Sequence, residues 1–172
     1  MPYPVIPAGQ RITAGLLTSM LPTYVVKPTD QQVTSSTTNV NDTGIIAAVA
    51  ANAIYVVTGM LLYSAHSSGD VRIGWTGPSG AVFDWIIHAQ TTGTGGLATA
   101  GVVVDRQSIG NTAFPLGGFG AENTTVMTAP LWGRLTTSST AGNLQLNWAQ
   151  QTSSGTATIM RAGSWLLLTR VG

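Results

Sequence analysis

Two histidine–aspartate pairs are the residues of this chain best suited to catalysis. His66 and Asp70 flank the stretch SSG, which predicts a turn, and Asp84 and His88 share one face of a predicted strand. A serine hydrolase needs a base beside its nucleophile and an acid that orients the base. Four residues along a strand span about 13 Å, so Asp84 cannot orient His88 directly. Because the chain also lacks a GxSxG turn, we expect that it is not an enzyme.

Metal and cofactor sites are not predicted either. A glycosidase needs two positioned carboxylates, and a calcium or magnesium site needs several oxygen ligands together. The six acidic residues are isolated from one another in the sequence: Asp30, Asp42, Asp70, Asp84, Asp105 and Glu122. The chain has no cysteine, which excludes a cysteine-based zinc site. The glycine-rich stretch 107–123 lacks the strand-to-helix setting of a phosphate-binding loop.

The five tryptophans raise the question of sugar binding. Four of them alternate in step with apolar neighbours and are expected in the core: Trp75, Trp85, Trp148 and Trp165. Trp132 instead shares its face with Arg134, opposite Leu131 and Leu135. We name Trp132 as the candidate glycan platform, with a place at the rim of the core or of a subunit interface as the favoured alternative.

The composition argues against a nucleic-acid partner. Only 8% of the residues are charged, against roughly 25% in an ordinary soluble protein. The seven Lys and Arg residues are spread singly along the chain, whereas a nucleic-acid binder needs clustered cations. We therefore expect no nucleic-acid partner. A length of 172 residues with 44% hydrophobic content fits one domain with a proper core.

Residues 44–65 are long and apolar enough to imitate a membrane span. No Lys or Arg lies close to either end, and the valines and tyrosines around Asn52 favour two strands joined by a turn. We predict no membrane insertion. The N-terminal stretch MPYPVIPAGQR does not resemble a secretion leader, so a role outside the cell would require release by lysis.

From residue 23 onward the sequence predicts β-structure throughout. The expected strands are 23–27, 32–39, 45–50, 53–65, 70–76, 81–89, 100–106, 124–135, 142–150 and 156–171, the last one broken at RAGS. Residues 107–123 are expected to form a long loop. Many short strands without a long helix predict an all-β fold, a single jelly-roll-like β-sandwich over residues 23–172.

Residues 1–22 predict an N-terminal docking arm. The prolines of PYPVIP hold the chain extended, and Thr13 and Pro22 are suited to cap and to stop a short helix. Such a helix is marginal alone and needs a surface to lie on. The apolar residues expected to contact that surface are Tyr3, Val5, Ile6, Leu16, Leu17, Met20 and Leu21.

The predicted strand 53–65 and the end of the predicted strand 156–171 are apolar on both faces. A second subunit is therefore expected to cover one face of these strands. The candidate interface residues are Tyr55, Val57, Leu61, Tyr63, Leu166 and Leu168. In GNLQLNWAQ, residues 142–150, one face is apolar and the other carries the neutral side chains of Gln145 and Asn147. That neutral face is suited to meet water, a sugar or a neighbouring copy, and the sequence leaves the three alternatives open.

Three stretches resemble small virion proteins of actinobacterial bacteriophages: MPYPVIPAGQRITAGLLTSMLP, SSGDVRIGWTGPSGA and AGNLQLNWAQQTSSGTATIMRAGSWLLLTRV. The resemblance implies a structural protein on the virion surface, made in the host cytoplasm and released by lysis. We expect a homotrimeric capsid decoration protein of head-fibre type, docked through its arm to the major capsid protein or to a tail protein. The trimer follows from analogy with other exterior phage sandwiches. The alternative is a minor tail or tail-fibre protein that binds a receptor or a host-surface glycan.

Overall fold

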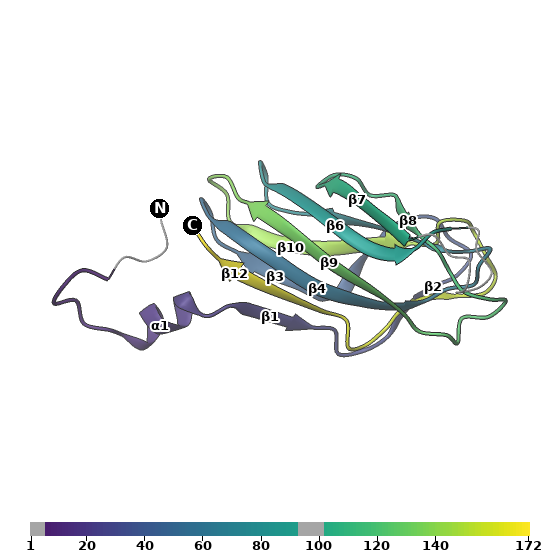
Figure 1. The fold of residues 1–172 in the computed structure, drawn as a ribbon, viewed down its shortest axis with the longest axis horizontal. Helices are drawn as coiled ribbons and strands as arrows, with labels where there is room; N and C mark the ends of the chain where they lie inside the picture. The colour runs from purple at the N-terminus through teal and green to yellow at the C-terminus, as the bar shows by residue number, and fades with distance from the viewer. Residues whose placement is uncertain (1–5, 93–101) are drawn as a thin grey trace.

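The computed structural model describes residues 6–92 and 102–172, and in these ranges the chain forms one helix and twelve strands (Figure 1). Their bounds are α1 Ala14–Met20, β1 Thr23–Val26, β2 Gln31–Val33, β3 Val40–Val49, β4 Ile54–Ser64, β5 Val71–Thr76, β6 Val82–Gln90, β7 Val102–Ser108, β8 Phe114–Leu116, β9 Met127–Thr136, β10 Gly142–Ala149, β11 Thr158–Met160 and β12 Trp165–Arg170.

The strand pairing defines a jelly roll. β3 pairs with β10, β4 with β9, β5 with β8 and β6 with β7, all antiparallel, so the chain from β3 to β10 is a set of nested hairpins. Successive pairs belong to alternate sheets, which gives the orders β3-β10-β5-β8 and β4-β9-β6-β7. This arrangement of eight strands in two sheets is the jelly-roll sandwich, as the sequence predicted.

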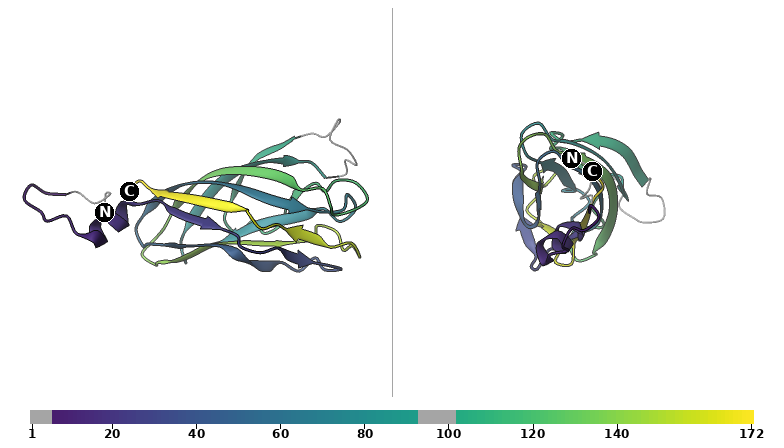
Figure 2. Two further views of the ribbon diagram at one scale, coloured as in Figure 1. Left: turned by 90° about the horizontal axis from the view of Figure 1, so that it is seen from below. Right: turned by 90° about the vertical axis from the view of Figure 1, so that its left-hand side faces the viewer.

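Additional strands widen only the sheet that contains β4. β12 lies beside β4, and β1 lies beside β12, so this larger sheet reads β1-β12-β4-β9-β6-β7. The short strand β11 connects β2 to the end of β4. Seen end-on, the two sheets wrap around a common interior (Figure 2). The larger sheet therefore presents a broad outer face across at least five described strands.

The core lies between the two sheets and is rich in aromatic side chains. Trp75, Trp85 and Trp148 are fully buried, which confirms their expected place. The rings of Trp75 and Phe83 meet edge to face, and so do those of Trp85 and Phe114, each with centroids 5.6 Å apart. Such edge-to-face pairs are favoured by the quadrupoles of the rings.

The short helix forms as predicted. The side-chain oxygen of Thr13 accepts a hydrogen bond from the backbone N–H of Leu16 at 3.2 Å, and the backbone turns extended at Leu21, just before Pro22. Helix α1 projects beyond the end of the sandwich (Figure 1). Its seven residues are too few for stability in isolation.

Segment 44–65 forms the end of β3 and all of β4, with Asn52 in the left-handed conformation of the turn at φ 49°. The predicted pair of strands is confirmed here, and no helix in the described ranges has the length and apolarity to span a bilayer. Two other predictions need correction. β2 ends at Val33 because Ser35 turns the chain at φ 52°, and the expected loop 107–123 contains β8, which pairs with β5 at the sheet edge.

Candidate functional site

The outer face of the larger sheet is the principal candidate for an interaction site. Cross-strand registers align Tyr24, Leu167, Thr58, Trp132 and Ile86 in one row over β1, β12, β4, β9 and β6. Tyr24 is 63% exposed and Trp132 is 44% exposed, while the other three are partly buried. The solvent side of an antiparallel sheet is normally polar. This row, apart from the hydroxyl of Thr58, is apolar.

The row on one side is also apolar, whereas the row on the other side is mixed and contains Thr169, Val56, Arg134 and Asp84. Val26, Trp165, Met60 and Pro130 form one neighbouring row, and the ring of Trp165 lies 6.0 Å from that of Tyr24. In the other row, Val56 is 46% exposed and stands opposite Arg134. We call the outward residues of these three rows on β1, β12, β4, β9 and β6 the outer apolar face.

Charge on the outer apolar face is balanced locally. Asp84 on β6 stands directly opposite Arg134 on β9, so one acid and one base occupy neighbouring positions. The imidazole of His88 packs edge-on against Trp132, with ring centroids 5.3 Å apart. The four-residue separation that keeps Asp84 from orienting His88 holds on β6, where both lie on the outward side. Asp84 and His88 therefore both lie on the surface of the sheet and are not arranged as a catalytic dyad.

Trp132 stands at the rim of a shallow hollow of about 340 Å³ that Asp84, Ile86 and Gly133 also line. Its exposure agrees with its selection as the exposed tryptophan of the chain. The expectation for Trp165 is wrong: its side chain is partly exposed on the outer apolar face, because Leu166 and Leu168 take the inward positions of β12.

The candidate subunit interface also needs correction. Its six members, Tyr55, Val57, Leu61, Tyr63, Leu166 and Leu168, are all buried in the core of the chain itself. Side chains alternate along β4 as predicted, but the four members on this strand lie on its inward face. The outward residues of β4 are on the opposite side and include Ile54, Val56 and Met60.

The described part of the arm carries uncovered apolar side chains. Ile6, Leu17 and Leu21 are exposed, and Leu16 and Met20 are partly buried. Tyr3 and Val5 lie outside the described residues. The end of α1 adjoins a hollow of about 400 Å³ at the end of the sandwich, lined by Thr18, Leu21 and Arg170 among others.

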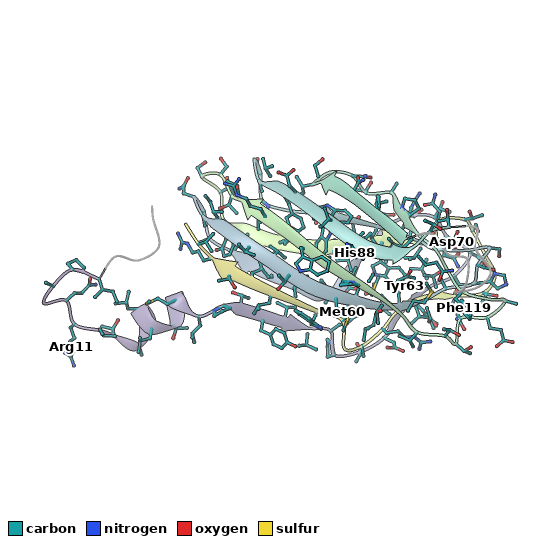
Figure 3. The ribbon with its side chains drawn as sticks, in the orientation of Figure 1. Arg11, Met60, Tyr63, Asp70, His88 and Phe119 are labelled. Atoms are coloured by element: carbon teal, nitrogen blue, oxygen red, sulfur yellow. The ribbon has the colours of Figure 1, made fainter. Side chains whose placement is uncertain are left out.

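The His66–Asp70 turn lies at the end of the sandwich remote from Arg11 (Figure 3). The ring Nδ1 of His66 accepts the backbone N–H of Ser68 at 2.9 Å, and Asp70 accepts that of Gly118 at 2.6 Å. Burial raises the pKa of Asp70, while the Gly118 hydrogen bond and the nearby His66 oppose that shift. These contacts close a turn in which Asp70 has φ 50°.

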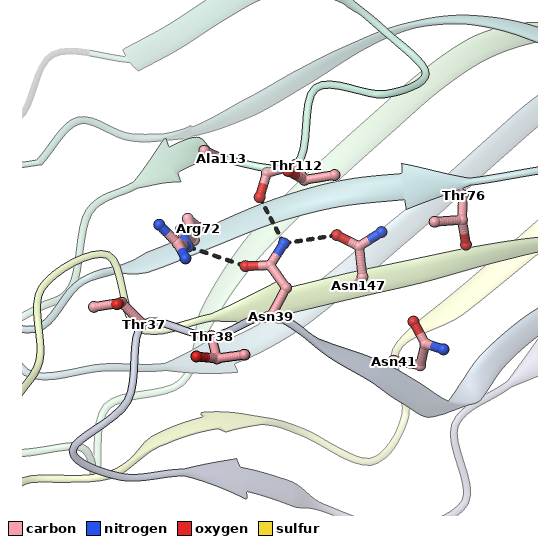
Figure 4. Close-up of a pocket in the computed structure, with 9 residues that line it drawn as sticks. All are labelled: Thr37, Thr38, Asn39, Asn41, Arg72, Thr76, Thr112, Ala113 and Asn147. Carbon is pink, nitrogen blue, oxygen red and sulfur yellow. Dashed lines mark hydrogen bonds between the residues drawn. The ribbon is translucent and has the colours of Figure 1, made fainter.

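The neutral face of β10 meets the chain itself. Asn147 is buried and accepts a hydrogen bond from Asn39, and Gln145 donates to the backbone oxygen of Asp42. A polar groove lies at this place on the outer face of the smaller sheet (Figure 4). Sequence reasoning missed it because its residues come from four separate segments.

No model of a known protein family matches the chain, and no curated protein matches it. Among solved structures, it is similar to that of infectious bursal disease virus strain Gx, with 11% identity and a TM-score of 0.24 over 87% of this chain and 41% of that chain. It is also similar to the VP2 subviral particle of that virus, with 11% identity and a TM-score of 0.21 over 87% of this chain and 40% of that one. The chain thus spans about two fifths of the length of these structures. The fold assignment rests on the strand order and register of the chain itself.

Proposed function

We propose that the protein is a structural component on the exterior of a bacteriophage particle, where it forms a homotrimer that decorates the capsid. The observation that carries the proposal is the outer apolar face, with its row of Tyr24, Leu167, Thr58, Trp132 and Ile86 across five strands. Monomeric proteins seldom leave a continuous apolar patch of this breadth in water. The resemblance of three sequence stretches to phage virion proteins supports the same role.

Self-association is favoured by the charge pattern of the outer apolar face. Asp84 and Arg134 are cross-strand neighbours, so their opposite charges offset one another within one chain and a second copy can cover this face without burying an unbalanced charge. A specific interface buries about 800 Å² per partner. In a closed trimer each contact is heterologous, so one part of the outer apolar face would pack against a different part of that face on the next copy. Three copies is the number suggested by analogy with exterior phage sandwiches.

The arm is the proposed attachment to the particle. Leu17 on α1 and Leu21 at its C-cap are exposed, and the helix projects from the end of the sandwich (Figure 1). Their burial against the major capsid protein would supply the packing that so short a helix needs. The outer apolar face and the arm thus have separate tasks, assembly and docking.

Light scattering after size exclusion tests the assembly. We expect the wild-type chain to have about three times the mass of its 17.8 kDa monomer. Val56→Asp places a charge on the outer apolar face and is expected to give a folded monomer. Ile46→Asp is the matched control, since Ile46 is similarly exposed, at 38%, but lies on the smaller sheet. A monomeric wild type, or a trimeric Val56→Asp variant, would contradict the proposed interface.

Immunogold electron microscopy of the encoding phage tests the location. Gold on the capsid is expected for wild-type particles, and its loss is expected for a Leu17→Asp, Leu21→Asp double variant that still forms trimers. Gold confined to the tail would contradict capsid decoration and favour the tail-protein alternative.

The alternative is a minor tail or tail-fibre protein that binds a glycan through Trp132. The observation in its favour is the hollow beside Trp132, with the imidazole of His88 against the indole. Trp132→Ala separates the two functions. Loss of cell adsorption with the trimer intact would favour the glycan platform, whereas loss of the trimer would favour the interface.

A further inference from the structure

The polar groove on the smaller sheet has the features of a binding site. It has a volume of about 560 Å³ and is lined by residues of the β2–β3 connection, β3, β5, β10 and the loop that precedes β8. Ligand pockets commonly have volumes of about 300–1,000 Å³. The groove opens on the sheet opposite to the outer apolar face, so assembly through that face leaves it accessible.

A chain of hydrogen bonds fixes the side chains at its centre. Arg72 Nε donates to Asn39 Oδ1 at 3.0 Å, and Asn39 Nδ2 donates to Asn147 Oδ1 at 2.8 Å and to the backbone oxygen of Thr112 at 2.6 Å (Figure 4). Each amide is therefore held in one orientation. Asn147 is only 4% exposed, and its nitrogen points away from Asn39 (Figure 4).

The polar groups of this network that make no hydrogen bond to a described residue are donors. Neither Asn147 Nδ2 nor the terminal nitrogens of Arg72 have a hydrogen-bond partner among the described residues. Among the described residues, no acidic side chain lines the groove, and its remaining walls carry threonine hydroxyls and the amide of Asn41. The guanidinium of Arg72 and the amide nitrogen of Asn147 are thus held in place and can donate hydrogen bonds to oxygen atoms of a ligand.

The close packing of this wall of the groove depends on Gly74, because a glycine has no side chain. A Cβ at Gly74 would lie 2.4 Å from Thr112 Cα and 3.0 Å from Asn147 Oδ1. Only glycine therefore lets the 111–113 segment settle onto β5 and accept the Asn39 hydrogen bond. Donors held in place before binding lose little entropy when a ligand arrives.

We propose that this groove binds an acidic saccharide, with the carboxylate of the sugar on Arg72 and a hydroxyl or ring oxygen on Asn147. A guanidinium pairs with a carboxylate through two parallel hydrogen bonds. Threonine and asparagine side chains around it match the hydroxyl groups of a sugar, and the absence of any acid in the lining avoids repulsion of the ligand's charge. This inference does not rest on trimer formation or on a place in the virion.

Binding to an array of oligosaccharides that carry uronic or sialic acids, with their neutral analogues, tests the proposal on the full chain. The wild type is expected to retain acidic members and to bind their neutral analogues at least tenfold more weakly. Arg72→Gln removes the charge-assisted pair and is expected to lower affinity by roughly 10- to 100-fold. Arg11→Gln, in the exposed N-terminal arm and outside both the groove and the outer apolar face, is the matched control and is expected to bind as the wild type does.

Two measurements keep the result interpretable. The thermal unfolding midpoint checks that Arg72→Gln is folded. Arg72→Lys retains the positive charge but cannot make the two parallel hydrogen bonds of a guanidinium, so it should bind with intermediate affinity. The proposal is overturned if the wild type binds no acidic member, if it binds neutral analogues equally well, or if a folded Arg72→Gln variant binds as the wild type does. Each of these outcomes leaves the light-scattering test of the trimer unaffected.

Discussion

Lys27 Nζ lies 2.9 Å from both carboxylate oxygens of Asp42, and the two side chains are completely shielded from solvent. Asp42 also accepts hydrogen bonds from the backbone N–H groups of Gly44 and Ile45 and from the indole of Trp148. The carboxylate is thus fully paired although it is buried. The ion pair joins the chain just after β1 to the start of β3, and so links the edge of the larger sheet to the smaller one.

Removal of one partner should be costly. Lys27→Met leaves the Asp42 carboxylate buried without a counter-charge, and we expect the free energy of unfolding to fall by about 3–5 kcal/mol. Equilibrium urea unfolding at fixed protein concentration measures the change. Asp30→Asn is the control, because the Arg161–Asp30 pair at 2.9 Å is partly exposed and should contribute about 1 kcal/mol or less. Equal losses in the two variants would contradict the special role of the buried pair.

Asp70 should make the protein less stable as pH rises through the acid range. Burial raises its pKa above the ordinary value, so between the two pKa values the folded chain holds a proton that the unfolded chain has lost. The contribution of Asp70 to the unfolding free energy therefore falls as pH rises through that window. Asp70→Asn keeps an acceptor for Gly118 and tolerates the positive φ.

The stability of Asp70→Asn relative to wild type is thus expected to increase from pH 3 upward, measured by urea unfolding at several pH values. Asp30→Asn should show the opposite trend. The Ala162 N–H and then Arg161 lower the pKa of Asp30, so its contribution is present above the ordinary pKa and is lost as pH falls. Parallel trends in the two variants would contradict these assignments.

The alternation of side chains predicted the strands well but could not say which face is inside. On β4, both Tyr55–Tyr63 and Ile54–Leu62 are apolar series, so periodicity treats them alike. The distinction depends on contacts far along the chain: at Gly59, on the inward face, an added Cβ would lie 2.6 Å from the side chain of Leu166. Trp165 was misplaced for the same reason, since its register beside Met60 is a tertiary property.

The polar groove could not be predicted because its residues lie far apart in the sequence. Asn39 is 33 residues from Arg72 and 108 residues from Asn147, and none of the three belongs to a recognisable motif. The one local signal is the neutral face of GNLQLNWAQ, which carries Gln145 and Asn147. Nested hairpins then bring β3, β5 and β10 side by side and complete the site.

Two tryptophans should respond differently to truncation. Trp148 is fully buried and bonded to Asp42, so Trp148→Ala is expected to cost about 3–5 kcal/mol of unfolding free energy at any protein concentration. Trp132→Ala removes a half-exposed ring and should scarcely destabilise a single chain. If the proposed trimer forms, Trp132→Ala should instead lower its melting temperature, and more strongly at low protein concentration. Thermal unfolding at two concentrations separates the effects, and a concentration-independent shift for Trp132→Ala would contradict its place in the interface.

Gly74→Ala tests whether the groove depends on close backbone packing. The added Cβ would lie 2.5 Å from the backbone oxygen of Asn111 and 2.4 Å from Thr112 Cα, so the 111–113 segment must move outward and release the Thr112–Asn39 hydrogen bond. Overpacking of this kind costs about 1–3 kcal/mol. Because Asn39 orients both Arg72 and Asn147, the variant should also lose acidic-saccharide binding while it remains trimeric. Gly155→Ala is the control, since a Cβ there meets nothing within 4 Å. If Gly74→Ala retained both wild-type stability and binding, the groove would not depend on this contact, and the orientation of Asn147 would need another cause.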